Sequence, residues 1–245
     1  MHNNSFFHVF FDLDKTLTKS RAPIASEHAP IFVALCKKSD VVVVTGGMAE
    51  HIREQLPKES EGMYAMLAQS GNEAVAKNGE VLWFEKFSDE QTKRSLAFIE
   101  KLKKYFNVKV RDENDLVELR GAQINYSVVG YHETPEVKYT FDPDFSKRKA
   151  ALAQFPLEQA QLAEVDVLVV PAGSSGFNII HASKNKGDNV ARLLARENWK
   201  KEDCLYVGDA LGPGENDETV IGVIPTHAVK DPDDTFRFIR ENLLS

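Results

Sequence analysis

The feature that most constrains this chain is an apolar segment that ends in two aspartates, HVFFDLDKTLT, from His8 to Thr18. The run up to Phe11 has the continuous apolar character of a strand that is covered on both faces. Asp12 and Asp14 follow with one residue between them, and two carboxylates this close repel each other unless a positive charge lies nearby. The segment therefore predicts a buried strand whose carboxyl end binds a divalent cation.

Short apolar runs of the same kind recur along the chain, and several are β-branched and nearly continuous. They occupy residues 6–11, 41–47, 64–71, 165–173, 204–210 and 220–227. Segments with apolar residues at helical spacing lie between several of them. Because strands that alternate with helices favour a parallel sheet covered on both sides, we expect an α/β fold with a doubly wound parallel sheet.

The middle of the chain has a different pattern. Asn78-Gly79 separates two apolar runs, which is the strongest short signal for a hairpin. Three further segments predict a long helix, alternating strands, and a helical stretch interrupted by a proline, and they cover residues 89–106, 116–133 and 143–163. We therefore expect an inserted α+β module with an antiparallel sheet. The predicted division is a core domain of residues 1–83 and 182–245 and an inserted domain of residues 84–181.

Composition excludes several classes of protein. The chain has 245 residues and a net charge of −7, which argues against a nucleic-acid partner. Its two cysteines form no Cys/His cluster, so a zinc site or a disulfide framework is not expected. The N-terminus lacks the pattern of a signal peptide, and no apolar stretch reaches the roughly 20 residues that span a bilayer. We expect a cytoplasmic protein without a membrane partner.

Polar residues follow three of the predicted strands. Asp12 and Asp14 end the first, Thr45 and Gly46 follow the second, and Asp209 follows the strand near residue 205. Ligands of parallel α/β sheets bind beyond the carboxyl ends of the strands. Lys186 begins a predicted helix, where the dipole favours anions, so its presence is best explained by an anion at the same place. Together these groups predict phosphoryl transfer.

The chemistry assigns a role to each group. Asp12 is the predicted nucleophile that forms an aspartyl phosphate, and Asp14 is the predicted acid and base. A carboxylate that attacks a phosphate dianion must overcome charge repulsion, so we expect Mg²⁺ as cofactor. The expected metal site consists of Asp12, the carbonyl of Asp14, and Asp209, with Asn216 and Asp217 orienting ligands or waters. Thr45, the amide of Gly46, and Lys186 are predicted to hold the phosphoryl oxygens.

Four segments, DLDKTLT, VVTGG, KGDNVARLL and VGDALGPGEND, resemble in order the four motifs of haloacid dehalogenase superfamily phosphotransferases. The resemblance implies a Rossmann-like core with an α+β cap of the C2B type (type IIB) inserted between the second and third motifs. The long final segment and RGAQINYSVVG are similar to the corresponding parts of eukaryotic-type phosphomannomutases. That likeness implies that the cap also forms a homodimer, although the apolar residues of 89–106 could equally be internal core.

The resemblance implies a set of substrate-binding residues beside Gly46, namely Arg120, Asn125, Ser127, Lys138 and Asn178. The chain departs from the pattern where Tyr131 and Lys138 take the places of two arginines, and Gly176 and Asn178 those of a serine and an aspartate. Arginine's planar fork grips a phosphate better than lysine does, so this cap is poorly suited to hold a bisphosphate. Arg120 could instead pair with Glu118 or Glu133 on the sheet face.

Three functions fit these observations. The leading hypothesis is a Mg²⁺-dependent phosphatase for a small phosphorylated metabolite, such as a sugar phosphate. The alternative is a phosphohexomutase that resembles phosphomannomutase, in which a sugar hydroxyl rather than water takes the phosphoryl group. The third is a non-catalytic phosphosugar-binding protein, against which the presence of Asp14 argues because binding alone has no need for it.

Overall fold

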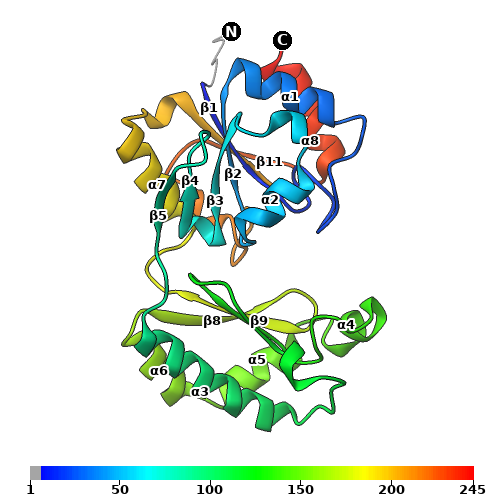
Figure 1. Ribbon diagram of the computed structural model, residues 1–245, viewed down its shortest axis with the longest axis vertical. Coiled ribbons are helices and arrows are strands. Elements are labelled where there is room, and N and C mark those ends of the chain that lie inside the picture. Colours follow the sequence, from blue (N-terminus) through cyan, green and yellow to red (C-terminus); the bar gives the residue numbers. More distant parts are fainter. Residues whose placement is uncertain (1–6) are drawn as a thin grey trace. The chain divides into compact units, whose positions relative to one another are not determined.

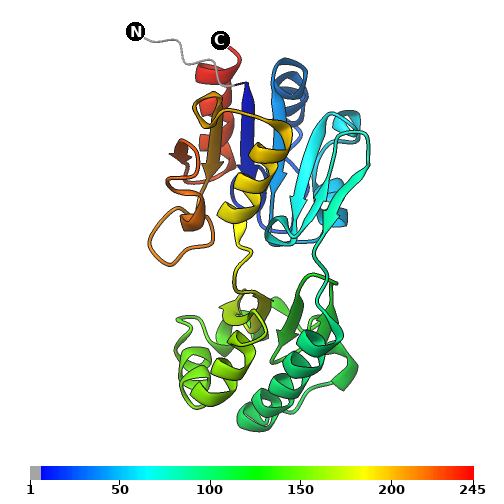
Figure 2. The same ribbon diagram turned by 90° about the vertical axis from the view of Figure 1, so that its left-hand side faces the viewer.

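The computed structural model describes residues 7–245, which form two compact units (Figures 1 and 2). The first unit comprises residues up to 84 together with 184–245, and the second comprises residues 85–183. Residues 1–6 lie outside the described residues, so the start of the expected strand 6–11 and the first six residues of the N-terminus considered for a signal peptide are not described.

The first unit is built on a seven-stranded sheet in the order β11-β10-β1-β2-β3-β4-β5. The strands from β11 to β3 pair in parallel, and β4 and β5 extend the sheet as an antiparallel edge. This arrangement confirms the predicted parallel α/β core. The bounds are β1 His8–Asp12, β2 Asp40–Val44, β3 Tyr64–Ala68, β4 Glu73–Val75, β5 Val81–Phe84, β10 Cys204–Gly208 and β11 Thr226–Ala228.

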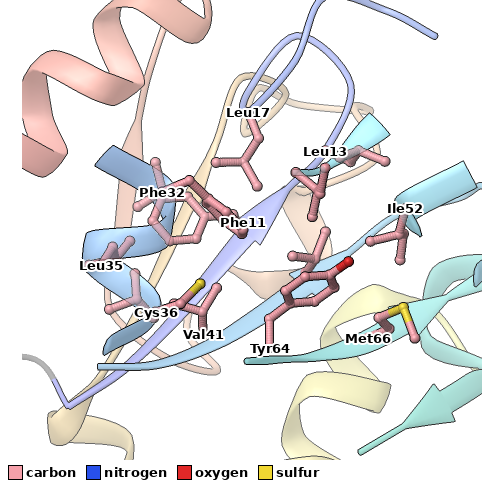
Figure 3. Close-up of a cluster of buried hydrophobic side chains, with 14 of the residues drawn as sticks. Phe11, Leu13, Leu17, Phe32, Leu35, Cys36, Val41, Ile52, Tyr64 and Met66 are labelled. Atoms are coloured by element: carbon pink, nitrogen blue, oxygen red, sulfur yellow. The ribbon is translucent and has the colours of Figure 1, made fainter. Parts of the chain in front are cut away.

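Helices cover both faces of this sheet, as a doubly wound fold requires. Their bounds are α1 Ala29–Lys38, α2 Ala49–Gln55, α7 Lys186–Glu197 and α8 Pro232–Phe238. Successive residues of β1 point to opposite faces. Phe11 packs in the cluster formed with α1, α2 and α8, where Figure 3 places it beside Phe32. Phe10 packs in the second cluster, which contains Val190 and Leu193 of α7.

The predicted hairpin around Asn78-Gly79 is confirmed, because β4 and β5 pair antiparallel across it. The expected strand at residues 220–227 is wrong over most of its length, since β11 begins only at Thr226. Gly222 has a φ of +86°, which turns the chain, and Pro225 has no amide to donate to a ladder. The apolar character of this run comes from burial of Val220 and Ile224 in the core.

The second unit is a four-stranded antiparallel sheet in the order β6-β7-β9-β8, with helices packed on its apolar face. Its elements are α3 Asp89–Phe106, β6 Val117–Leu119, β7 Ile124–Ser127, α4 Pro135–Phe141, α5 Ser146–Ala153, α6 Pro156–Ala163, β8 Val167–Ala172 and β9 Gly176–His181. The expected segment 143–163 is two helices, and Pro156 begins the second. Phe98, Ile99 and Leu102 of α3 are buried inside this unit, so they belong to its core.

A buried arginine holds the second unit together at the turn between β8 and β9. The Arg148 side chain is fully buried, and its Nε donates to Oδ2 of Asp142 at 2.8 Å. One terminal nitrogen donates to the carbonyls of Ala172, Gly173 and Gly176 at 2.8–3.0 Å. Burial raises the pKa of Asp142, but hydrogen bonds from Arg148 and two backbone amides outweigh it, so the pKa lies below its ordinary value. Arg148 therefore ties α5 to the hairpin.

Replacing Arg148 with Met should destabilise this unit by about 3–5 kcal/mol, because the buried Asp142 carboxylate loses its partner. Both tryptophans, Trp83 and Trp199, lie in the first unit. Hydrogen-exchange mass spectrometry should therefore report the loss of protection in β8 and β9, while the tryptophan fluorescence of the first unit changes less in urea. Arg94→Met, which removes a more exposed ion pair with Glu90, should cost much less stability, because solvent screens such a pair. Equal effects of the two substitutions would contradict this assignment.

Candidate active site

A buried lysine connects two of the predicted site acids. The Nζ of Lys186 donates to Oδ1 of Asp12 and to Oδ1 of Asp217, both at 2.6 Å. All three side chains are at most 5 % exposed. The anion that the sequence predicts near this helix start is therefore supplied, within the chain, by two carboxylates.

Asp209 joins the same site through a residue that the sequence analysis did not select. Oγ1 of Thr16 accepts from the amide of Asp209 at 3.0 Å and donates to its Oδ1 at 3.1 Å. This pair of bonds fixes the chain after β10 to the loop after β1. Thr16 lies in the DLDKTLT segment, two residues after Asp14, and this position is the sequence feature that could have identified it as a site residue.

A second missed residue is Tyr206, in the middle of β10. Its side chain is fully buried, and its hydroxyl donates to Oδ1 of Asp217 at 2.8 Å. Nothing in the apolar run CLYVG separates this tyrosine from an ordinary core aromatic. The only sequence signal is that a buried tyrosine hydroxyl needs a partner.

Local backbone structure brings these segments together. Asn185 and Asp188 form a capping box that begins α7, so Lys186 is the first helical residue. The amide of Gly187 donates to Oγ1 of Thr219, and a Cβ on Gly187 would come within 1.9 Å of the Thr219 carbonyl oxygen. The loop that carries Asp217 therefore lies directly against the start of α7, at a distance that only glycine permits.

The site holds more negative than positive charge. Ligand atoms of Asp12, Asp209 and Asp217 lie within 4.8 Å of one another, and the ammonium of Lys186 contacts two of these acids. Burial raises the pKa of Asp12 to about 7, with Lys186 opposing the rise and the neighbouring aspartates adding to it. Burial also raises the pKa of Asp209, although Thr16 lowers it. Burial lowers the pKa of Lys186, but the two carboxylates outweigh this and raise it above its ordinary value.

The donor set suits a hard divalent cation. The three acids offer only oxygen ligands, which Mg²⁺ prefers. Oδ2 of Asp217 is buried and has no hydrogen-bond partner among the described residues. A buried carboxylate oxygen without a donor is costly unless a cation or a bound water satisfies it. The residues present therefore fit a bound metal ion.

The structure places the other predicted core residues around this group with different exposure. Asp14 is half-buried, and its Oδ1 accepts from the amide of Arg21 at 2.6 Å. Thr45 is buried and follows Val44, which pairs in register with Asp12. A Cβ added to Gly46 would meet no atom within 4 Å, so the space on that side of the residue is open. Asn216 is exposed, in contrast to its fully buried neighbour Asp217.

The predicted substrate residues of the inserted unit fall into two groups. Arg120, Asn125, Ser127 and Asn178 lie on or beside the sheet, where Asn125 pairs in register with Asn178. Oγ of Ser127 accepts from the amide of Gly130 at 3.1 Å. Lys138 lies instead on α4, and its Nζ donates to the carbonyl of Tyr131. The structure thus places Lys138 on a different element from the other four.

The charge of Arg120 is engaged by Glu118, as one of the two sequence alternatives predicts. Its Nε and one terminal nitrogen donate to Oε2 of Glu118 at 2.9 and 2.6 Å. The amide oxygen of Asn125, in the orientation that satisfies its neighbours, accepts from both terminal nitrogens of Arg120 at 3.1 and 3.2 Å. Glu133 contacts Arg111 instead.

Comparison with known families agrees with the fold and the motifs. The family model for haloacid dehalogenase-like hydrolases matches residues 9–222. The chain therefore belongs to the haloacid dehalogenase-like hydrolases. Among curated relatives, it is 23% identical to a phosphomannomutase of Drosophila melanogaster, over 96% of this chain and 94% of that protein. It is 24% identical to a phosphomannomutase of Dendrobium officinale, over 93% and 90% of the two chains.

Solved structures share the fold at low sequence identity. The IMP-bound IMP-nucleotidase of Plasmodium falciparum, in a mutant form, superposes with a TM-score of 0.69 at 16% identity. The match covers 99% of this chain and 67% of that one. A protein of Thermotoga maritima superposes with a TM-score of 0.62 at 18% identity, over 95% of each chain. These likenesses support the haloacid dehalogenase fold, including the inserted α+β unit.

Gly187→Ala should test the contact between α7 and the loop of Asp217. Helix propensity alone predicts that alanine stabilises the protein, by up to about 1 kcal/mol. The clash with the Thr219 carbonyl predicts the opposite sign, a loss of about 1–3 kcal/mol. Urea denaturation followed by tryptophan fluorescence measures the difference. Ala195→Gly, at an exposed position of the same helix, should cost about 1 kcal/mol through propensity alone. A more stable Gly187→Ala protein would contradict the observed contact.

Proposed function

We propose that this protein is a Mg²⁺-dependent phosphatase that hydrolyses a small phosphorylated metabolite, such as a sugar phosphate, through an aspartyl-phosphate intermediate. The observation that carries the proposal is the meeting of Asp12, Asp209, Asp217 and Lys186 in one group, in which only Asp209 is less than fully buried. Three separate segments of the sequence contribute to it, in a chain of the haloacid dehalogenase-like hydrolase family. A binding protein without catalysis has no need for this many buried charges, which are expensive to bring together.

In the first chemical step, a carboxylate oxygen of Asp12 attacks phosphorus while the bond to the leaving oxygen breaks. Asp14 in its acid form gives its proton to that leaving oxygen, so the organic product departs as an alcohol. Lys186 orients Asp12 through the bond to Oδ1, and its positive charge favours the ionised carboxylate. Mg²⁺, when bound by the three acids, supplies positive charge that offsets repulsion between the nucleophile and the phosphate.

In the second step, Asp14 takes a proton from water, whose oxygen attacks phosphorus and breaks the bond to Asp12. Inorganic phosphate leaves, and both aspartates return to their starting states. Thr45 and the amide of Gly46, at the strand end next to Asp12, would hold phosphoryl oxygens together with Lys186. The inserted unit would select the organic part of the substrate.

The second candidate function is a phosphohexomutase, and the names of the curated relatives favour it. Such an enzyme must bind a second phosphate while the first is transferred. In this chain, Arg120 donates two hydrogen bonds to the Glu118 carboxylate, which largely neutralises its charge, and the side chain of Arg120 is only 7 % exposed. Tyr131 and Lys138 stand where the mutase pattern has arginines. These features support transfer to water over transfer to a sugar hydroxyl. Homodimerisation through the inserted unit stays a prediction.

Among the described residues, no helix is long and apolar enough to cross a membrane. Independently of that finding, we propose a small phosphorylated molecule as the substrate, without a nucleic-acid or membrane partner.

Asp12→Asn should lower phosphate release by at least about three orders of magnitude, because an amide cannot act as the nucleophile. The fold should persist, since Lys186 keeps its bond to Asp217. The measurement is phosphate release from a panel of hexose and disaccharide phosphates, with Mg²⁺ and with EDTA. Asp40→Asn is the matched control and should retain activity, because Asp40 begins β2 and so lies at the end of that strand away from the site. Turnover by the Asp12 variant at the wild-type rate would exclude the proposed mechanism.

Glu118→Gln should separate the two enzyme functions. Loss of the carboxylate leaves the Arg120 guanidinium with its full positive charge, so a hexose 1,6-bisphosphate should bind about tenfold more tightly. Inhibition of phosphate release by that bisphosphate measures the change, and conversion of hexose 1-phosphate to 6-phosphate is followed in parallel. Glu158→Gln, which removes a partner of Lys101 elsewhere in the same unit, is the control. Mutase activity above hydrolysis in the wild-type protein would favour the second candidate.

A further inference from the structure

We propose that Tyr206 is a positioning residue of the metal site: with Lys186 it holds Oδ1 of Asp217 and so commits Oδ2 to the hydrated divalent cation. This inference rests on the proposed metal site and assigns a function to a hydroxyl in an otherwise apolar strand. Tyr206 would act through Asp217, without touching the substrate.

The first argument is the saturation of one oxygen. Oδ1 of Asp217 accepts from Lys186 at 2.6 Å and from the hydroxyl of Tyr206 at 2.8 Å. Two donors occupy the lone-pair directions of that oxygen and fix the plane of the carboxylate. Oδ2, by contrast, is buried and has no donor among the described residues. One oxygen of the Asp217 carboxylate therefore has two hydrogen-bond donors, and the other has none among the described residues.

The second argument is the position of Oδ2. A Cβ on Gly208 would come within 2.4 Å of this oxygen and within 2.9 Å of Cε1 of Tyr206. Oδ2 therefore lies directly against the last residue of β10, and the next residue of the chain is Asp209. The absence of a side chain at Gly208 leaves the space that this carboxylate needs, beside another acid of the group.

The third argument is that packing alone does not require the hydroxyl. Tyr206 pairs in register with Phe10 of the neighbouring strand β1, and both rings are fully buried in the same cluster. A phenylalanine would fill the position and leave no polar group to satisfy. Burying a hydroxyl is unfavourable unless it makes a hydrogen bond, and here the bond goes to an acid of the site. The role of the Tyr206 hydroxyl is therefore to hold the Asp217 carboxylate in place.

Tyr206→Phe removes this one hydroxyl and keeps the ring, so it tests the proposal directly. We expect the affinity for Mg²⁺ alone, without substrate, to fall by about tenfold or more, the usual effect of losing a group that orients a metal ligand. The readout is the Mg²⁺-dependent rise in the unfolding midpoint across a titration, from which the dissociation constant follows. Tyr64→Phe changes a buried tyrosine of the same unit outside the site and should leave the affinity unchanged.

The same titration distinguishes the possible outcomes. A hydroxyl that only stabilises the fold would lower the midpoint equally with and without Mg²⁺, and this result would overturn the proposal. An affinity within about twofold of wild type would overturn it as well, while leaving the phosphatase proposal intact. If the wild-type protein shows no Mg²⁺-dependent rise, the proposed metal site fails and this inference falls with it.

Discussion

The buried ammonium of Lys186 is the interaction on which the rest of the site depends. It contacts one acid at the end of β1 and another in the loop after β10, from its own place at the start of α7. Taking these charges out of water is costly, and removal of Lys186 would leave two carboxylates in the interior without a positive partner. The sheet order is what makes the contact possible, since β10, β1 and β2 are neighbours and end on one edge. The parallel order of the strands therefore brings together the buried charges of the site.

The same charges connect stability to function. Three acids with one lysine leave the group short of positive charge. Burial raises the pKa of Asp12, Lys186 offsets part of the rise, and the neighbouring aspartates add to it. A structure selected for stability alone could replace such a cluster with apolar side chains at little cost. Retention of the acids is explained when a cation completes the group. Oδ2 of Asp217, which has no hydrogen-bond partner among the residues that the structure describes, shows the same lack of positive charge.

The acids of the site in the first unit could be predicted from the sequence, because all strands of a parallel sheet have their carboxyl ends at the same edge. Asp12 and Asp209 follow apolar runs, so a parallel sheet brings them to one edge without further information. Tyr206 could not be found this way, since its role depends on which side chain its hydroxyl meets across the core. The prediction of a strand at 220–227 was wrong over most of its length because Val220 and Ile224 are buried in the core without forming a strand, and the chain turns at Gly222. The sequence leaves two possible partners for Arg120, namely Glu118 and Glu133, and only the three-dimensional structure shows that Arg120 pairs with Glu118 while Glu133 contacts Arg111.

Two of the arginines in the inserted unit, Arg148 and Arg120, have different surroundings. Arg148 is enclosed and donates to Asp142 and three carbonyls, so its whole guanidinium maintains the fold. Arg120 is on the strand-connecting turn beside β7, where Glu118 accepts two of its hydrogen bonds and the Asn125 oxygen accepts two more. An arginine held in this way offers a phosphate little net charge, since a second anion must compete with a carboxylate already in place. A neutral, hydroxyl-rich group would meet no such competition, because it carries no charge that the carboxylate repels. We therefore expect the sheet face of this unit to suit the organic part of a monophosphate better than a second phosphate.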